Sequence, residues 1–334
     1  MVSFQQPTII KAIPNYDKVL IGILDNKIIT LKLYQYSDFS STQALEVPQL
    51  TLRPKLSEST EPQAIDYFAC KDRKYIIYNK TVQFNGANRA TETISCIQND
   101  TTIFNIYAVA EAKKGVQGYN ALAIYNDKLF ALDTKAAKVF VYNNLTGNYI
   151  ESFAGKGSQD GHLDKPKSIA IDSDGMIYIA DWGNSRIAIF DENTAHIHNI
   201  ELKAKGLKPQ LLRISGQNLY FLANDSSIYQ MSLNDDSTLK MITTAEKIST
   251  FDILYEDRLG YIDGITQQLN VIYDNNYEHR YFSKNAKGIF PGFGNIYLIR
   301  YNPYNKTLYI CDKMAKYTRL LTFYYSPKKP QTIY

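Results

Sequence analysis

The sequence predicts an all-β protein, a closed β-propeller of four-stranded antiparallel blades that occupies residues 1–334 as a single domain. Short apolar runs rich in β-branched residues alternate with tight-turn signals. The chain contains 27 Tyr and 15 Phe, which favour strands over helices. An Asp or Asn also follows an apolar run at a period of about 48 residues, and that period is typical of stacked four-stranded units.

The clearest unit lies between residues 155 and 193. Its apolar runs at residues 168–172, 176–180 and 186–190 read as three strands, and residues 196–202 supply a fourth. Asp174-Gly175 separates the first two runs, because a Gly after Asp provides the positive φ of a tight turn. Asp181 begins the turn between the second and third runs. We therefore expect a four-stranded meander here.

The residue that occupies the place of Asp181 can be traced along the whole chain. It follows one apolar run and precedes another each time, and a second series of turn signals stays in step with it. Since no such unit buries both of its faces alone, the units must stack. The series predicts seven blades, with six as the alternative if the first unit is misread. The anchors are Asp25, Asn79, Asp133, Asp181, Asp225, Asp263 and Asp312.

Two stretches exceed what the repeat needs. Residues 40–61 are polar and contain Pro48 and Pro54, which indicates a long loop. Residues 101–118 read as an outer strand followed by a loop that carries lysines. We expect the ring to close through residues 330–334 or through residues 7–10, because closure protects the strand edges.

Residues 155–193 resemble an NHL repeat, the unit of a family of β-propellers. The departure from that pattern is Asn184-Ser185-Arg186, where the family has Asn-His-Leu. The resemblance implies a propeller, usually of six blades. Some relatives bind RNA on the face that carries the turns after the second strands, and some similar propellers are metal-dependent lyases or lactonases. The matching positions are Asp160-Gly161, Pro166, Asp172, Asp174-Gly175, Ile177-Tyr178, Ala180-Asp181, Asn184, Arg186-Ile187 and Phe190.

Composition limits the compartment and the partners. The net charge of +4 is a mild bias that does not by itself imply nucleic acid or membrane. Three cysteines, Cys70, Cys96 and Cys311, favour buried thiols in a reducing compartment, with one disulfide as the alternative. No secretory signal and no apolar run of about 20 residues is seen, so we expect an intracellular protein without a membrane span.

The sequence shows no catalytic constellation. His196 and His198 alternate on one face of an expected outer strand, but no third ligand accompanies them, so an exposed pair is favoured over a metal site. Asp66, Asp172 and Asp252 lie on expected inner strands, where a structural role is favoured over metal binding in the channel. We therefore expect no catalytic residues, no metal, no cofactor and no enzymatic activity.

The turns after the second strands supply the candidate binding rim. Basic and aromatic side chains together can grip phosphates or stack bases, and loops on a rigid scaffold can equally seat a protein. The plainer interpretation is a solvated rim whose lysines are offset by the Asp of each turn. The candidate residues are Lys135, Trp182, Asn184, Arg186, Lys313 and Tyr317.

The sequence favours a non-catalytic scaffold that binds protein partners as a subunit of a larger assembly. RNA binding is the first alternative, and a metal-dependent lyase or lactonase is the second. Because the fold does not require the stretches at 40–61 and 101–118, we expect at least one of them, rather than the rim around Trp182, to contact the partner.

Overall fold

The computed structural model describes thirteen stretches of the chain. The described stretches are residues 7–12, 18–25, 28–35, 50–52, 64–70, 73–98, 101–235, 237–254, 258–272, 278–281, 295–302, 307–313 and 318–324. The chain divides into two compact units. One comprises residues 1–61 and 254–334, and the other comprises residues 62–253.

The described residues form seven antiparallel sheets, six of four strands and one of three. In the second unit, the strands of each sheet are neighbours in chain order. These strands are β5 (Ala64–Cys70), β6 (Arg73–Phe84), β7 (Ala87–Gln98), β8 (Thr101–Tyr107), β9 (Ala121–Tyr125), β10 (Lys128–Asp133), β11 (Lys138–Asn143), β12 (Tyr149–Phe153), β13 (Ile169–Ile171), β14 (Ile177–Asp181), β15 (Arg186–Phe190), β16 (His196–Glu201), β17 (Pro209–Ser215), β18 (Asn218–Ala223), β19 (Ser227–Ser232), β20 (Leu239–Thr244) and β21 (Ile248–Ile253).

Only short helical segments interrupt these strands within the described part of the second unit. They are α1 (Ala108–Glu111) and the 3-10 turns η2 (Ala112–Lys114) and η3 (Lys203–Lys205). The first unit contributes β1 (Pro7–Ala12), β2 (Lys18–Asp25), β3 (Ile28–Gln35), β4 (Leu50–Leu52), β22 (Leu259–Asp263), β23 (Leu269–Ile272), β24 (Glu278–Tyr281), β25 (Asn295–Asn302), β26 (Thr307–Lys313) and β27 (Thr318–Tyr324). Strand β27 lies beside β4.

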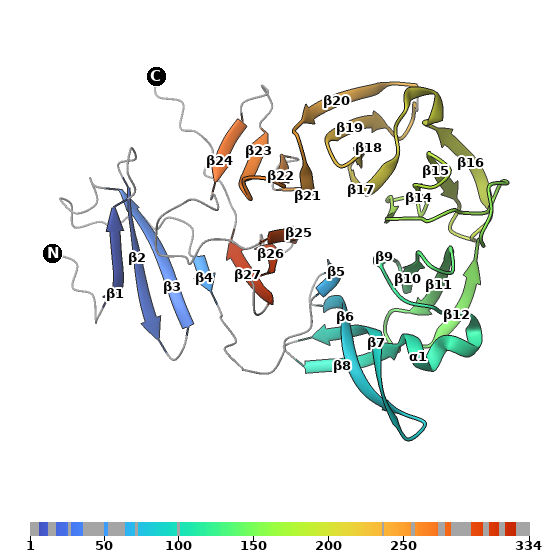
Figure 1. Cartoon of the computed structure of the whole chain (residues 1–334), viewed down its shortest axis with the longest axis horizontal. Helices are drawn as coiled ribbons and strands as arrows, with labels where there is room; N and C mark the ends of the chain where they lie inside the picture. The colour runs from blue at the N-terminus through green and yellow to red at the C-terminus, as the bar shows by residue number, and fades with distance from the viewer. Residues whose placement is uncertain are drawn as a thin grey trace. The chain divides into compact units, whose positions relative to one another are not determined.

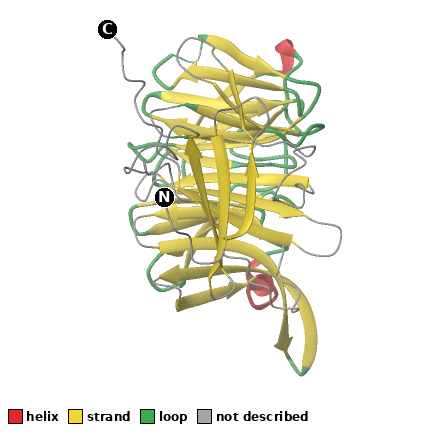
Figure 2. Cartoon of the chain, turned by 90° about the vertical axis from the view of Figure 1, so that its left-hand side faces the viewer, coloured by secondary structure: helices red, strands yellow, loops and turns green. Residues whose placement is uncertain are grey.

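The second unit has the arrangement of propeller blades. Its first strands β5, β9, β13, β17 and β21 are neighbours in that order, while the last strands β8, β12, β16 and β20 lie on the outer side (Figure 1). Figure 2 shows how completely strands dominate the chain. The chain is therefore an all-β propeller with antiparallel four-stranded blades, as the sequence predicts.

The core lies between blades, because each blade buries both of its faces. In β10, Leu129 and Ala131 pack toward the blade before it, while Phe130 and Leu132 pack toward the blade after it. Successive side chains of a strand point to opposite faces, so one strand serves two interfaces. This is why the second strands read as continuous apolar runs rather than alternating ones.

The predicted number of blades, seven or six, is wrong. The consecutive series from β5 to β24 contains five four-stranded blades, whereas β1–β4 form a further sheet and β25–β27 form a sheet of three strands among the described residues. Closure of the ring through residues 7–10 is one of the predictions. In the structure these residues lie in β1, which pairs with β2 of its own sheet. Residues 330–334 lie outside the described residues. The single domain and the closed ring stay predictions.

The strands of the clearest unit are confirmed. β13 to β16 begin and end within a residue or so of the predicted runs, and β15 matches residues 186–190. The anchors Asp133 and Asp181 end their strands as expected, and Asp225 lies in the turn after β18. Asn79 is a wrong anchor, because it lies inside β6 and the chain turns only at Asn85-Gly86.

The two stretches predicted as insertions have different outcomes. In residues 40–61 the structure describes β4 alone. In residues 101–118 the predicted outer strand is β8, and the predicted lysine-bearing loop begins with α1 and η2. This stretch therefore contains the last strand of a blade and part of its connection to the next blade.

Candidate functional site: a lysine-rich face around Trp182

One end of the second unit gathers two kinds of loop. In a four-stranded meander the turn after the second strand lies at the end where the chain also crosses to the next blade. Residues 134–137, 182–185 and 224–226 are such turns, and residues 108–120, 154–168, 202–208 and 245–247 are such crossings. We call this end of the second unit the basic face. The opposite face carries the other turns of each blade.

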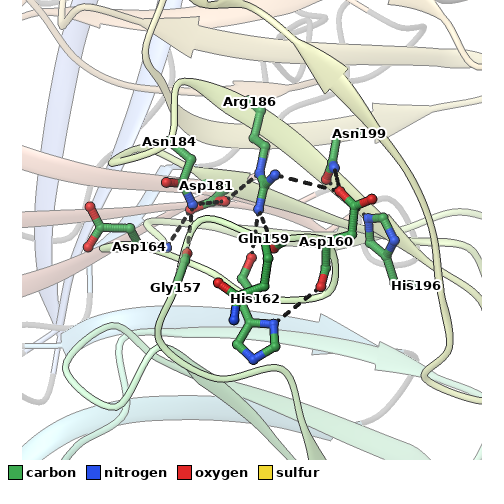
Figure 3. Close-up of polar contacts among 10 residues, drawn as sticks. All are labelled: Gly157, Gln159, Asp160, His162, Asp164, Asp181, Asn184, Arg186, His196 and Asn199. Carbon is green, nitrogen blue, oxygen red and sulfur yellow. Dashed lines mark hydrogen bonds and ion pairs between the residues drawn. The ribbon is translucent and has the colours of Figure 1, made fainter.

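A buried carboxylate fastens a crossing to a turn on the basic face (Figure 3). Asp181 is fully buried and accepts hydrogen bonds from the Asp164 backbone N–H at 2.7 Å, from Asn184 Nδ2 at 2.7 Å and from Arg186 Nε at 2.8 Å. Burial raises the pKa of the Asp181 carboxyl, and these three donors oppose that rise. Asn184 also donates to the Gly157 carbonyl at 3.0 Å, so the whole turn is tied to the crossing.

Arg186 extends the same fastening toward the outer strand. Its side chain is only 6% exposed, and Nη2 donates to the carbonyls of Gln159 at 3.1 Å and His162 at 2.8 Å. Nη1 lies 4.0 Å from Asp160, which accepts from Asn199 of β16 at 2.7 Å. The guanidinium therefore holds the loop at 159–162 in place (Figure 3).

Asp133 repeats the device one blade earlier. It is fully buried, and one carboxylate oxygen accepts from the backbone N–H groups of Lys135 and Ala136 at 3.0 and 2.9 Å. The other oxygen accepts from the N–H groups of Gln117 and Gly118 at 2.6 and 3.0 Å. The recurring Asp thus has a structural purpose: it satisfies backbone donors of both loop types and makes this face rigid.

Trp182 projects from the fastened turn and is surrounded by lysines. The Nζ atoms of Lys208, Lys167 and Lys165 lie 4.5, 5.4 and 5.9 Å from the centroid of its ring. Lys165 and Lys167 come from the crossing into β13, whereas Lys208 comes from the crossing into β17 of the next blade. The three ammonium groups have no ion-pair partner among the described residues. They form a cationic cluster around one half-buried aromatic side chain.

The rest of the basic face has the same sign of charge. Its described loops expose three acidic side chains, Asp160, Asp225 and Glu246, against ten lysines. On the opposite face the described turns expose Asp127, Asp174, Glu192 and Asp235 but no Lys or Arg. The exposed lysines of the basic face are Lys113, Lys114, Lys135, Lys156, Lys165, Lys167, Lys203, Lys205, Lys208 and Lys247.

The structure separates the predicted rim residues into two groups. Lys135 is 62% exposed, lies 3.7 Å from Glu92, and shares the basic face with Trp182. Asn184 is half-buried and Arg186 is buried. The Nδ2 of Asn184 and the guanidinium of Arg186 donate to Asp181 and to loop carbonyls. Lys313 ends β26 but its side chain is outside the described residues, as is the whole of Tyr317.

Sequence reasoning missed Lys165, Lys167 and Lys208. The signal for the first two was available, since they flank Pro166 at the start of a predicted strand. Lys208 lies 26 positions after Trp182 and reaches the indole only because the next blade stacks beside it. Neither histidine of β16 has a metal-ligating neighbourhood: no group of three or more His, Cys, Asp or Glu suited to a metal occurs among the described residues.

With the geometry established, comparison with known proteins identifies the repeat. Residues 163–190 match the NHL repeat. The matched segment contains the end of the crossing, β13, β14, the Trp182 turn and β15. Mouse teneurin-1 is 29% identical over 117 residues and human teneurin-1 is 30% identical over 118 residues; each match covers 34% of this chain. The chain spans 4% of the length of these curated relatives.

Solved structures share the fold at low identity. A virginiamycin B lyase from Staphylococcus aureus, solved with quinupristin, has a TM-score of 0.55 and 12% identity over 81% of this chain and 97% of its own. The Pan2 WD40 domain of Neurospora crassa has a TM-score of 0.53 and 8% identity over 97% and 90%. Hydrazine synthase of Kuenenia stuttgartiensis has a TM-score of 0.51 and 13% identity over 77% and 76%. Identities this low show the propeller fold alone.

Within the described part of the chain, no helix has the length and apolar character needed to cross a bilayer.

Proposed function

We propose that this protein is a non-catalytic propeller scaffold whose basic face binds an acidic protein partner within a larger assembly. The observation that carries the proposal is the convergence of Lys165, Lys167 and Lys208 on Trp182. Like charges repel, so a cluster of this kind is stabilised when a partner supplies carboxylates. The indole adds apolar area of the kind that anchors protein interfaces.

The rigidity of the loops supports a role in binding. Asp133 and Asp181 fasten the turns to the crossings through buried hydrogen bonds. A surface that is held in one arrangement loses little conformational entropy when a partner docks. The same fastening engages the Nδ2 of Asn184 and the guanidinium of Arg186, so lysines and one indole are the main groups that the face presents around Trp182. Such groups provide electrostatic steering and contact area.

RNA binding is the second candidate, and the pairing of an indole with ammonium groups favours it. Single-stranded nucleic acid is held by aromatic stacking together with basic side chains. The proposal ranks it second because the exposed basic groups in the described loops around Trp182 are all lysines, and Arg186 is buried. Trp182 is also the only tryptophan of the chain, and Lys208 lies over its ring. The prediction that the chain is no enzyme stays a prediction.

Fluorescence of Trp182 tests the proposal directly, because this single tryptophan lies in the face. The probes are a peptide of alternating Thr and Glu and a poly-U oligonucleotide of equal charge. We expect the peptide to quench or shift the emission more tightly than the oligonucleotide. Lys208→Glu should weaken peptide binding about tenfold, equivalent to about 1.4 kcal/mol, by replacing attraction with repulsion.

Lys240→Glu is the matched control. Lys240 is exposed on β20, away from the basic face, and its replacement changes the net charge by the same amount as Lys208→Glu. It should leave peptide affinity unchanged. Equal losses in both variants would mean that only net charge matters. Tighter binding of the oligonucleotide would favour the RNA candidate, and no binding of either probe would refute the proposal.

A further inference from the structure

Strands β6 and β7 extend well beyond the blade to which they belong. They pair along twelve positions, from Arg73↔Gln98 to Phe84↔Ala87. The inner strand β5 accompanies β6 only as far as Tyr78, and the outer strand β8 accompanies β7 only from Thr93. Residues 79–92 therefore form a two-stranded ribbon that leaves the blade (Figures 1 and 2). Its turn is the one after the second strand, so the ribbon rises from the basic face.

The root of this ribbon is fixed. Thr91 is buried, and its Oγ1 accepts the backbone N–H of Val109 in α1 at 2.9 Å. Glu92 lies 3.7 Å from Lys135 of the neighbouring blade. From the root, the five residues from Lys80 to Phe84 rise about 16 Å at the spacing of an extended strand. The tip between residues 85 and 90 is exposed throughout.

The turn at the tip sets which backbone groups face outward. Asn85 has φ 51° and Gly86 has φ 75°, as in a two-residue type I′ turn. The pair that flanks such a turn, Phe84↔Ala87, is hydrogen-bonded, and bonded and non-bonded pairs then alternate. Asn88 and Ala90 consequently belong to non-bonded pairs, so their N–H and C=O groups point away from β6.

An edge of this kind is a ready template for another strand. Two-stranded ribbons are marginal by themselves in water, and exposed edges are usually covered or protected. No described strand pairs with β7 between Asn88 and Glu92. On one face of the ribbon, Lys80 and Arg89 add two cations to those of the basic face, and Val82 lies on the same face directly opposite Arg89.

We propose that the outer edge of β7, from Asn88 to Glu92, takes up an extended strand of the acidic protein partner. The added strand would receive main-chain hydrogen bonds from Asn88 and Ala90. Its acidic side chains would lie beside Arg89, where opposite charges across strands stabilise the pairing. Lys80 lies one strand further away, on β6, and adds positive charge to the same face of the ribbon. This inference rests on the proposed function, and it adds where the partner binds and in what conformation.

Two proline variants test the edge. Ala90→Pro removes an outward N–H of β7 without touching the bonds inside the ribbon, because Pro is tolerated on an edge that faces water. Thr81→Pro is the matched control, since Thr81 is the cross-strand partner of Ala90 and presents the opposite edge of the ribbon. We expect Ala90→Pro to weaken binding of the alternating Thr-Glu peptide at least tenfold and Thr81→Pro to weaken it less than twofold.

A second measurement needs no variant. In the unaltered protein, saturation with the peptide should slow amide hydrogen exchange at Asn88 and Ala90, and a peptide of alternating Thr and Lys should not. Equal affinity of the two proline variants, or unchanged exchange at both amides, overturns the inference. A loss confined to Thr81→Pro overturns it too, because the strand would then be on the β6 edge. Concentration-dependent self-association that Ala90→Pro abolishes would assign the edge to a second copy and also overturn it.

The inference and the proposed function fail in different ways. If the peptide binds, and Lys208→Glu weakens it while Ala90→Pro does not, the basic face is the site and the ribbon is not. If the peptide does not bind the unaltered protein at all, the proposed function fails first.

Discussion

Removing the Asp181 carboxylate should destabilise the protein strongly, although this residue is a candidate for neither catalysis nor binding. Asp181→Ala leaves the Arg186 guanidinium buried without its carboxylate at 2.8 Å, and it leaves the N–H of Asp164 without an acceptor. Breaking a buried ion pair by removing one partner costs about 3–5 kcal/mol. We expect a loss of this size in the free energy of unfolding.

Asp225→Ala provides the matched control. Asp225 is the counterpart of Asp181 in the sequence pattern, but it lies in the turn after β18 rather than at the end of the strand. It is exposed, and its carboxylate accepts only from Gln210 at 2.7 Å among the bonds described. The loss of one exposed hydrogen bond should cost roughly 0.5–1 kcal/mol. The same substitution at a buried and at an exposed Asp of the turn series thus measures what burial of the carboxylate adds.

Urea unfolding, followed by the fluorescence of Trp182, measures the free energy of unfolding of both variants. Circular dichroism serves as a second probe, because substitution of Asp181 can itself change the emission of the adjacent Trp182. Coincident transitions would support two-state analysis. Arg186→Met completes a cycle, and the double variant should lose about 1–3 kcal/mol less than the sum of the single losses. The reasoning is refuted if Asp181→Ala and Asp225→Ala differ by less than about 1 kcal/mol, the least that burial of an ion pair should add.

Two further substitutions probe the packing. Gly183→Ala places a Cβ 2.6 Å from the Asp164 carbonyl oxygen and should cost about 1–3 kcal/mol, whereas Gly155→Ala meets only an ordinary contact at 3.7 Å and should be nearly neutral by urea midpoint. Tyr119→Phe removes one partner of the buried pair in which the hydroxyls of Tyr119 and Tyr142 lie 2.7 Å apart, and it should cost about 1–2 kcal/mol. Tyr149→Phe, at an exposed hydroxyl, should cost less than half as much; equal midpoints for either matched pair would contradict the packing described.

The strands of the blades were predictable because their signals are local. Asp174-Gly175 turns with φ 85° at the glycine, and the runs on either side become β13 and β14. The ribbon was missed for a local reason as well. Asn79 follows an apolar run and precedes another, so it imitates an anchor, but the Asn85-Gly86 dipeptide is the stronger hairpin signal and marks the turn that forms.

The candidate site was predictable only in part. Trp182 and Lys135 lie in turns that the repeat itself marks, and both belong to the basic face. Burial of Arg186 follows from its register opposite Asp181, which no composition argument reveals. The approach of Lys208 depends on how adjacent blades stack, and that contact is not encoded in any one unit of the repeat.

The recurring Asp also changes how the charge of the basic face should be understood. One interpretation of the sequence is that each turn carboxylate offsets the lysines beside it. Asp133 and Asp181 are instead fully buried: backbone N–H groups surround the first, and Arg186 compensates the second. Among the described residues neither carboxylate forms an ion pair with an exposed lysine of this face, so direct pairing with these two carboxylates does not neutralise the lysines. The same residues that make this face rigid therefore leave it cationic, and a binding partner meets both properties at once.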